Sequence, residues 1–203
     1  MSDMAKVDDR IGSPAFAISL IASPTDQTRA SLCAIQDLVA DTLPDTVYRC
    51  PGHSLHLSVF QFVYSRKSKP SHQMPIWNKL CENAGIQLQS ITNESQACFL
   101  ESLDMQVSDS AVIVQFAPSR DIELLRDRLE PIVRQSKLAW NRPAIQHVTL
   151  YRYTQPFRLS PIASILSAID LPNVTWKIDS LDLVQESCYP SLQNKLIQSY
   201  SLG

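Results

Sequence analysis

The same order of apolar segments occurs twice along the chain, and this repetition restricts the possible folds more than any other feature. The first copy begins with an apolar run at residues 16–22, which is long enough for one buried strand. Ser23 and Pro24 then form a start signal for a helix, with the serine as N-cap and the proline at the first helical position. After a turn, residues 55–64 have the composition of a second strand.

The second copy has matching elements. An apolar strand at residues 111–117 is followed by a helix that Ser119 caps, and then by a strand at residues 146–153. These elements lie 91 to 96 residues after their counterparts. Further segments complete both copies, and they are predicted as a helix at 75–84 that ends at Gly85, a strand at 97–107, a short helix begun by Ser160 and Pro161, and closing strands at 174–184 and 195–202.

The proportion of strands to helices indicates the fold class. Strands outnumber the helices that could cross between parallel strands, and several neighbouring strands are joined by short turns, so the sheets should be largely antiparallel. We therefore predict an α+β fold with two lobes related by a pseudo-twofold axis, each with an antiparallel sheet and outer helices, and a cleft between the sheets. Residues 1–14 are expected to be an N-terminal tail, and residues 15–203 a single bilobal domain.

The content of charged residues, glycine and cysteine restricts the kinds of ligand site that are possible and indicates the cellular compartment. A formal net charge of −2 argues against a general binder of nucleic acids or membrane surfaces, so a phosphate ligand would need a local cationic site. Four glycines and no Gly-rich loop motif exclude phosphate sites of that kind. Five scattered cysteines without a C-x-x-C pair predict a reducing cytoplasm. We expect no signal peptide, no transmembrane helix and no contact with a membrane.

Two of the four histidines occupy the same place in the two copies. His56 and Ser58 form the motif H-x-S, and His147 and Thr149 form H-x-T 91 residues later. In a strand, residues i and i+2 point to the same face, so each motif presents an imidazole beside a hydroxyl. One such motif would more simply be a partly buried histidine with a local hydrogen bond. Two at matching positions favour a shared site around one small anion.

These motifs resemble those of the two-histidine (2H) phosphoesterase superfamily, which includes the bacterial 2′,5′ RNA ligases/cyclic phosphodiesterases and the eukaryotic cyclic nucleotide phosphodiesterases. Bacterial members of the RNA-ligase type continue the second motif as H-V-T-L-A-R; Arg152 matches this pattern, whereas Tyr151 departs from it. Ser58 stands where those members usually have threonine. The resemblance covers residues 16–202. It implies a bilobal α+β fold and cleavage of 2′,3′-cyclic phosphates or related nucleotide phosphodiesters with no metal and no other cofactor.

The resemblance makes His56 and His147 the acid and base, and Ser58 and Thr149 the ligands of the phosphate. The chemistry agrees with these roles. Hydrolysis takes a proton from water and gives one to the departing ribose oxygen, and one neutral and one protonated imidazole can do both near neutral pH. We prefer His147 for the water and His56 for the leaving group, while the sequence leaves this order open. The two hydroxyls can donate to the non-bridging phosphate oxygens.

The residues after the second motif are candidates for substrate binding. Strict alternation places Tyr151 and Tyr153 on the face of His147, where their rings could stack on a base. It places Arg152 on the opposite face, unless a β-bulge turns this side chain toward the site. Phe60 and Phe62 share the face of His56, but their burial preference favours the core.

Other basic and histidine residues carry weaker signals. The stretch from Arg66 to Lys69 is expected to be a solvated loop, with contact to the phosphates of an oligonucleotide as the alternative. His53 and His72 are expected in loops. The H-x-x-H spacing of His53 and His56 has no further metal-binding side chain nearby, so no metal site is predicted.

Two functions from different classes fit the motifs. The first is a metal-independent phosphodiesterase that hydrolyses a 2′,3′-cyclic phosphate or a 2′,5′-linked nucleotide, in a nucleotide or an RNA end, with ligation as the reverse reaction. We expect it to act as a cytoplasmic monomer. The second is a nucleotide-binding module with the same fold and no turnover. A U6-type RNA exonuclease is a third, because it shares the serine of the H-x-S motif. The presence of both histidines and both hydroxyls favours catalysis.

Overall fold

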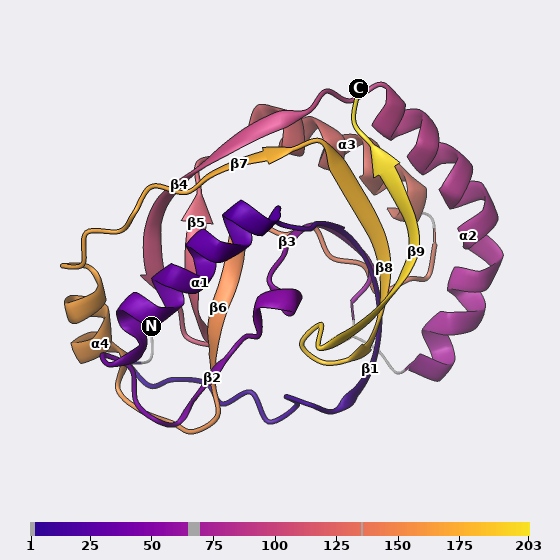
Figure 1. The fold of residues 1–203 in the computed structure, drawn as a ribbon. Helices are drawn as coiled ribbons and strands as arrows, with labels where there is room; N and C mark the ends of the chain where they lie inside the picture. Colours follow the sequence, from indigo (N-terminus) through magenta and orange to yellow (C-terminus); the bar gives the residue numbers. More distant parts are fainter. Residues whose placement is uncertain (1–2, 65–69, 135) are drawn as a thin grey trace.

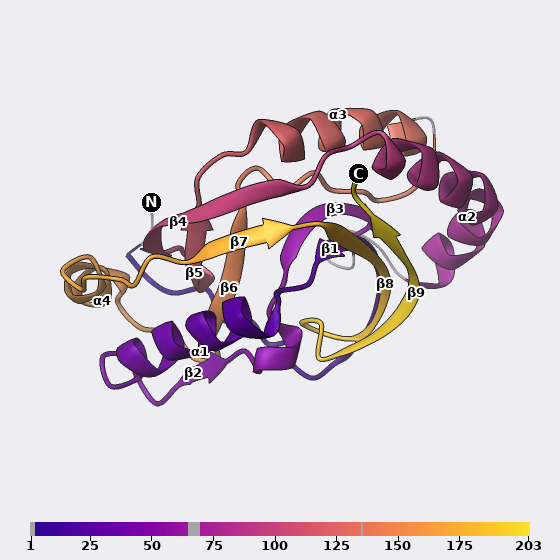
Figure 2. The ribbon, with the colours of Figure 1, turned by 45° about the horizontal axis from the view of Figure 1, so that its top comes forward.

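The structure, a computed structural model, describes residues 3–64, 70–134 and 136–203. Within these residues, nine strands form one curled sheet in which every pairing is antiparallel. The prediction of an α+β fold with antiparallel sheets is confirmed. In Figures 1 and 2, α2 and α3 lie along the outer side of the curled sheet, and α4 lies at the opposite end of the molecule.

The bounds of the elements are as follows. The strands are β1 Pro14–Ala22, β2 Val47–Arg49, β3 Leu57–Val63, β4 Cys98–Val107, β5 Ala111–Phe116, β6 His147–Tyr153, β7 Thr175–Ile178, β8 Ser180–Cys188 and β9 Gln193–Ser201. The helices are α1 Asp26–Ala40, α2 Pro70–Asn93, α3 Arg120–Arg134 and α4 Leu159–Leu166, with one 3-10 turn, η1, at Gly52–Ser54.

The two lobes meet at one point in the sheet. The strand order is β7-β4-β5-β6-β3-β1-β8-β9, and β2 pairs with β6 outside this path. One lobe therefore contains β3, β1, β8 and β9, and the other contains β7, β4, β5, β6 and β2. Between them, β3 and β6 pair only at Leu57 and Val148. The two predicted sheets are thus joined into one by the strands that carry the two histidine motifs.

Each motif strand is held by a helix from the other copy of the repeat. Gln36 on α1 donates through Nε2 to the carbonyl oxygen of Leu150 in β6 at 2.9 Å. Arg126 on α3 donates through Nε to the carbonyl oxygen of Val59 in β3 at 3.0 Å. The Leu150 carbonyl also accepts from the backbone N–H of Cys50 at 2.9 Å, so Gln36 adds a second donor there, and Arg126 supplies a side-chain donor to Val59.

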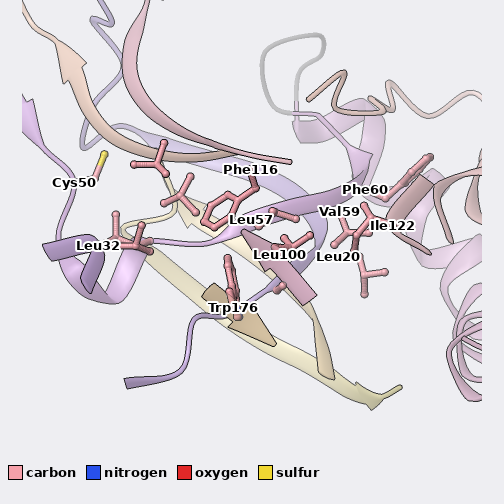
Figure 3. Close-up of a cluster of buried hydrophobic side chains, with 14 of the residues drawn as sticks. Leu20, Leu32, Cys50, Leu57, Val59, Phe60, Leu100, Phe116, Ile122 and Trp176 are labelled. Carbon is pink, nitrogen blue, oxygen red and sulfur yellow. The ribbon is translucent and has the colours of Figure 1, made fainter. Parts of the chain in front are cut away.

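One hydrophobic core runs through both lobes. Leu57 and Val59 of β3 are fully buried, as is Leu20 of β1, and Ile122 of α3 packs beside them. In Figure 3, Val59, Ile122 and Leu20 lie on one side of the cluster, and Leu57 lies between them and Phe116 from the other lobe. The predicted core positions Phe60 and Phe62 are both completely buried. The motif strands therefore turn one face to this core and leave the other face for the site.

The start of α1 differs from the prediction. Thr25, not Ser23, is the N-cap, and its hydroxyl accepts a hydrogen bond from the backbone N–H of Thr28 at 3.2 Å. Ser23 instead donates to the carboxylate of Asp182 at 2.7 Å. The serine that precedes the proline is therefore used in a contact with β8, and the helix begins two residues later than a cap at Ser23 would allow.

Helix α2 is much longer than the predicted helix at residues 75–84. It continues through Gly85 to Asn93, because buried Trp77, Ala84 and Leu88 form one apolar stripe that passes Gly85 without interruption. Packing of this stripe outweighs the roughly 1 kcal/mol that a mid-helix glycine costs. His72, expected in a loop, lies exposed in the described part of this helix.

Two smaller differences concern the strand predicted at residues 174–184 and the N-terminal residues. The closing strand predicted at residues 174–184 is divided at Asp179 into β7 and β8, which belong to different lobes. Residues 3–13, part of the predicted tail, are hydrogen-bonded to the body of the protein. The backbone N–H groups of Ala5 and Asp8, for example, donate to the carbonyl oxygens of Phe157 and Tyr153, both at 2.8 Å.

Candidate active site

The two histidine motifs lie side by side at the junction of the lobes. Because β3 and β6 are antiparallel and Leu57 pairs with Val148, His56 stands opposite Thr149 and Ser58 stands opposite His147. Leu57 and Val148 are fully buried on the core face, whereas the four motif residues are half-buried on the other. All four line one cavity of about 390 Å³. The structure thus brings together both imidazoles and both hydroxyls that the sequence singled out.

A β-bulge follows the motif in each of the two strands. In β6, Thr149 pairs with Ile113 and Tyr151 with Val112, so Leu150 is an extra residue. In β3, Ser58 pairs with Ile21 and Phe60 with Leu20, so Val59 is extra in the same way. A bulge reverses the alternation of side chains beyond it. As a result, the third residue after each hydroxyl turns back to the cavity.

The bulges bring Gln61 and Arg152 into the site. Both side chains line the cavity, and they stand 91 residues apart, the same interval as the two histidines. Arg152 therefore reaches the cavity because of a β-bulge, which is the exception to strict alternation that the sequence allowed. Gln61 was not singled out as a site residue. Its signal was available, because continuing the alignment of the two motifs by three residues places it opposite Arg152.

The same bulge overturns the prediction that Tyr151 and Tyr153 are substrate-binding residues on the face of His147. Both rings are buried on the core side and neither lines the cavity. The Tyr151 hydroxyl donates to the carbonyl oxygen of Gln36 at 2.7 Å, and the Tyr153 hydroxyl donates to that of Ser108 at 3.1 Å. Each phenol satisfies its hydroxyl with a backbone carbonyl, which is what permits its burial.

His56 is oriented by the backbone two residues before it. Its Nδ1 lies 2.8 Å from the carbonyl oxygen of Ser54, which can only accept, so Nδ1 carries the proton in this contact. In the neutral ring, Nε2 is then the free base. Burial lowers the pKa of His56, the Ser54 carbonyl opposes this effect, and the positive charge of Arg152 lowers the pKa further.

His147 stands in a matching but more cationic environment. Burial is the largest cause that lowers its pKa, and the Ile145 carbonyl, two residues before it, opposes this. His56, Arg152 and Arg126 each lower the pKa of His147 as well. The Nδ1 atom of His147 is buried and forms no hydrogen bond with any described residue. The Ile145 carbonyl therefore acts on the ring as a nearby dipole. The effect of His56 on the pKa of His147 agrees with the position of both rings on one cavity.

At the end of the cavity beyond the second motif, the positive charge of Arg152 is paired with an acidic side chain. Arg152 donates to the carboxylate of Asp8 at 3.1 Å, and the Tyr189 hydroxyl donates to the same carboxylate at 2.6 Å. The guanidinium of Arg152 also lies 5.2 Å from the centre of the Tyr189 ring, and that of Arg10 lies 4.3 Å from it. Nothing in the sequence around Asp8 indicated this contact, because it joins residues 144 positions apart.

The Cys50 thiol lines the same end of the cavity. Burial raises its pKa to about 11, although Arg152 acts in the opposite direction. The thiol is therefore protonated at neutral pH and is a poor nucleophile.

The remaining predicted residues lie outside the site or outside the described structure. His53 is exposed in η1 and does not line the cavity. The basic stretch from Arg66 to Lys69 lies outside the described residues. Within the described ranges, no group of three histidine, cysteine, aspartate or glutamate side chains has the arrangement of a metal site. No helix in the described part of the chain is long and apolar enough to span a bilayer.

Comparison with solved structures identifies the fold. A phosphoesterase crystal structure matches with a TM-score of 0.65 and 14% identity, over 92% of this chain and 98% of that chain. E. coli LigT in its apo form matches with a TM-score of 0.63 and 14% identity, over 94% and 99% of the two chains. TT0787 of Thermus thermophilus matches with a TM-score of 0.61 and 16% identity, over 92% and 97%.

Structures of E. coli LigT complexed with 3′-AMP, phosphate, ATP and NADP⁺ also match, with TM-scores of 0.59 to 0.61. No model of a protein family and no curated protein sequence matches the chain. At these identities the likeness concerns the fold. The chain has the LigT-like fold over nearly its whole length, in agreement with the resemblance that the two motifs carry.

Proposed function

We propose that this protein is a metal-independent phosphodiesterase that hydrolyses a 2′,3′-cyclic phosphate or a 2′,5′-linked nucleotide, with His56 and His147 as its acid and base. The observation that carries the proposal is the pairing of the two motif strands. It places an imidazole and a hydroxyl from each copy of the repeat on one cavity, in a cross-strand arrangement around the Leu57 and Val148 pair. We further expect the protein to act in the cytoplasm as a monomer, on a nucleotide or an RNA end.

The reaction needs two proton transfers. The base takes a proton from water as its oxygen attacks phosphorus, and the acid gives a proton to the ribose oxygen as its bond to phosphorus breaks. The product is a phosphate monoester with a free hydroxyl, and each imidazole ends in the protonation state opposite to the one in which it began. Run in reverse, the same two transfers would join the hydroxyl and the phosphate.

We assign the base to His147 and the acid to His56. Three cationic neighbours, His56 in its charged form, Arg152 and Arg126, lower the pKa of His147, whereas Arg152 is the one cation among the described residues that lowers that of His56. A charged His56 therefore favours the neutral form of His147, which is the form required of a base. A bound phosphate, as an anion, favours the charged imidazolium at His56, from which the leaving oxygen takes its proton.

The hydroxyls of Ser58 and Thr149 are suited to bind the non-bridging oxygens. Each stands opposite the histidine of the other motif, so the two donors approach the phosphate from opposite sides. Negative charge on these oxygens changes as the phosphorus passes through its five-coordinate state, and fixed donors stabilise that charge without reorganisation. Arg152 is bound to Asp8, and its role is to contribute positive potential, which is already felt at both histidines.

The ligands found in structures with the same fold support a nucleotide substrate. E. coli LigT has been crystallised with 3′-AMP and with phosphate, which combine a nucleoside with the phosphate group that such a cavity would hold. The cavity volume of about 390 Å³ is in the range of small-ligand sites, and a mononucleotide is of matching size.

The proposal is tested by incubating the purified protein with 2′,3′-cyclic nucleotides, 2′,5′-oligoadenylates and RNA ends in the presence of EDTA. We expect turnover of at least one of these substrates, unchanged by the chelator, and its loss in the His56→Ala and His147→Ala variants. Nucleotide binding without turnover by the wild type would instead indicate a binding module of this fold. A strict requirement for an added divalent metal would overturn the proposed chemistry.

A further inference from the structure

We propose that Gln61 and Asn141 form a nucleobase subsite at the end of the cavity opposite Arg152, an inference that rests on the proposed function. The subsite would read the hydrogen-bonding edge of the base attached to the ribose whose phosphate lies between the two histidines. It replaces the tyrosines of β6, which the bulge removes from the cavity.

The two amide side chains form a fixed unit. The backbone N–H of Gln61 donates to the carbonyl oxygen of Asn141 at 3.0 Å, and the backbone N–H of Asn141 donates to that of Gln61 at 2.9 Å. Nδ2 of Asn141 also donates to Oε1 of Gln61 at 2.8 Å. Both residues line the cavity. The backbone bonds hold the two positions together whatever their side chains are.

The amide pair retains both kinds of hydrogen-bonding group. One amide oxygen and one N–H are used between the two side chains, and this remains true if both amides are turned over together. The pair is left with N–H donors and an amide oxygen side by side, and no described residue forms a hydrogen bond with them. Each of the four bases of RNA has a donor and an acceptor next to each other on its Watson–Crick edge. An adjacent donor and acceptor on the protein is therefore complementary to a nucleobase.

The surroundings of the pair fit a flat ring. Tyr64, three residues after Gln61, lines the cavity, as do Pro143 and Ile145 on the segment that leads from Asn141 to His147. These side chains add aromatic and apolar surface beside the two amides, and they add no charge. A heterocycle can be covered by such groups while its edge is hydrogen-bonded.

The two ends of the cavity differ in charge, and this difference sets the direction in which a nucleotide would bind. Gln61 is neutral, while Arg152 occupies the equivalent position after the other bulge and is paired with Asp8. A second phosphate placed at the Arg152 end would compete with the Asp8 carboxylate for this guanidinium. The base is therefore assigned to the Gln61 end, and the preferred substrate is a nucleoside 2′,3′-cyclic phosphate without a further phosphate at the Arg152 end.

The test compares adenosine 2′,3′-cyclic phosphate with ribose 2,3-cyclic phosphate, which lacks the base. We expect Gln61→Leu and Asn141→Ala each to lower kcat/KM for the adenosine substrate about three- to tenfold, mainly through KM, which is the loss expected for one or two net hydrogen bonds. The ribose substrate should be turned over as by the wild type. Gln198→Leu, at an exposed position of β9, is the matched control and should change neither value.

An equal fall in kcat/KM for both substrates would show that the pair only holds the segment before His147. An unchanged kcat/KM for both would show that the base binds elsewhere. Either result overturns the inference and leaves the proposed function in place. If the wild type turns over neither of these substrates, nor the 2′,5′-oligoadenylates and RNA ends, the proposed function fails. The inference is then decided by calorimetric binding of 3′-AMP and ribose 3-phosphate. A three- to tenfold loss in the variants for 3′-AMP alone supports the subsite, and equal affinities rule it out.

Discussion

Nε of Arg126 donates to the carbonyl oxygen of Val59 at 3.0 Å, and this bond joins a helix of the second repeat to the motif strand of the first. The same guanidinium donates through Nη2 to the carbonyl oxygen of Ser58 at 3.3 Å and through Nη1 to Glu123 at 2.5 Å. Its side chain is fully buried. Arg126 therefore satisfies two carbonyls beneath the site at the point where β3 has left β6.

Replacing Arg126 by methionine should destabilise the protein by at least about 2 kcal/mol, because two buried carbonyl groups would lose their donor. The measurement is the free energy of unfolding from urea denaturation. Arg134→Met is the matched control: this arginine also pairs with a glutamate on α3, but its side chain is 72% exposed. A surface pair of that kind is worth about 0–1 kcal/mol. Equal losses in the two variants would contradict the structural role given to Arg126.

Either histidine should be indispensable for turnover. His56→Ala and His147→Ala should each reduce kcat about 10²-fold or more, because each removes one of the two proton transfers. Steady-state kinetics would measure this, with circular dichroism to verify that the variants are folded. His72→Ala, on the exposed side of α2, is the control and should retain full activity. Full activity in either cavity variant would remove the acid and base roles.

The pH dependence of the reaction follows from the lowered pKa values of both histidines. The ordinary pKa of 6.5 is lowered at His56 and at His147, mainly by burial. The reactive form has one ring neutral and the other charged, so kcat/KM, which reports on the free protein, should be bell-shaped with its maximum below about pH 6.5. Bound phosphate raises both pKa values, so the profile of kcat should be displaced toward alkaline pH. Coincident profiles with an optimum above pH 8 would contradict this assignment.

The same shifts make stability depend on pH. A histidine whose pKa is lower in the folded protein binds its proton more weakly there than in the unfolded chain. The free energy of unfolding should therefore fall as the pH falls below 6.5 and should stop falling once the pH is below the folded pKa. The double variant His56→Gln/His147→Gln should lose less stability than the wild type between pH 7.5 and 5. Urea titrations at several pH values measure this, and parallel curves would refute it.

Tyr151 should be a structural residue. Tyr151→Phe removes the hydroxyl that donates to Gln36 and should lower the free energy of unfolding by about 1 kcal/mol, while KM for a cyclic nucleotide stays unchanged. Thermal or urea denaturation and steady-state kinetics provide the two measurements. A large rise in KM with unchanged stability would restore the stacking role that the alternation of β6 first suggested.

The sequence predicts the four motif residues that line the cavity, and the fold class, because both depend on local patterns that occur twice. His56 with Ser58 and His147 with Thr149 need only the period of a strand. Which faces of the sheet Tyr151 and Arg152 occupy depends on one extra residue, Leu150. The position of this bulge is determined by the pairing of β6 with β5 and β2, which no local sequence pattern encodes. The bulge exchanges the roles of the tyrosine and the arginine.

Long-range contacts account for the other differences. The continuation of α2 past Gly85 is determined by the surface on which Leu88 packs, and the contact between Asp8 and Arg152 joins residues 144 positions apart. Gln61 was within reach of the sequence, since it occupies the position of Arg152 in the other copy. Asn141 was not, because its partner lies 80 residues away.

The position of β1 between β3 and β8 has a consequence for the protein while it is being synthesised. One neighbour of β1 follows after a few dozen residues, but the other, β8, is synthesised only after strands β2 to β7 and all four helices. Until then one side of β1 is an open edge, and such edges pair with other chains. Premature termination at Asp179 would leave this edge open permanently. Such a truncated chain should therefore aggregate, even though it contains every residue assigned to the chemistry.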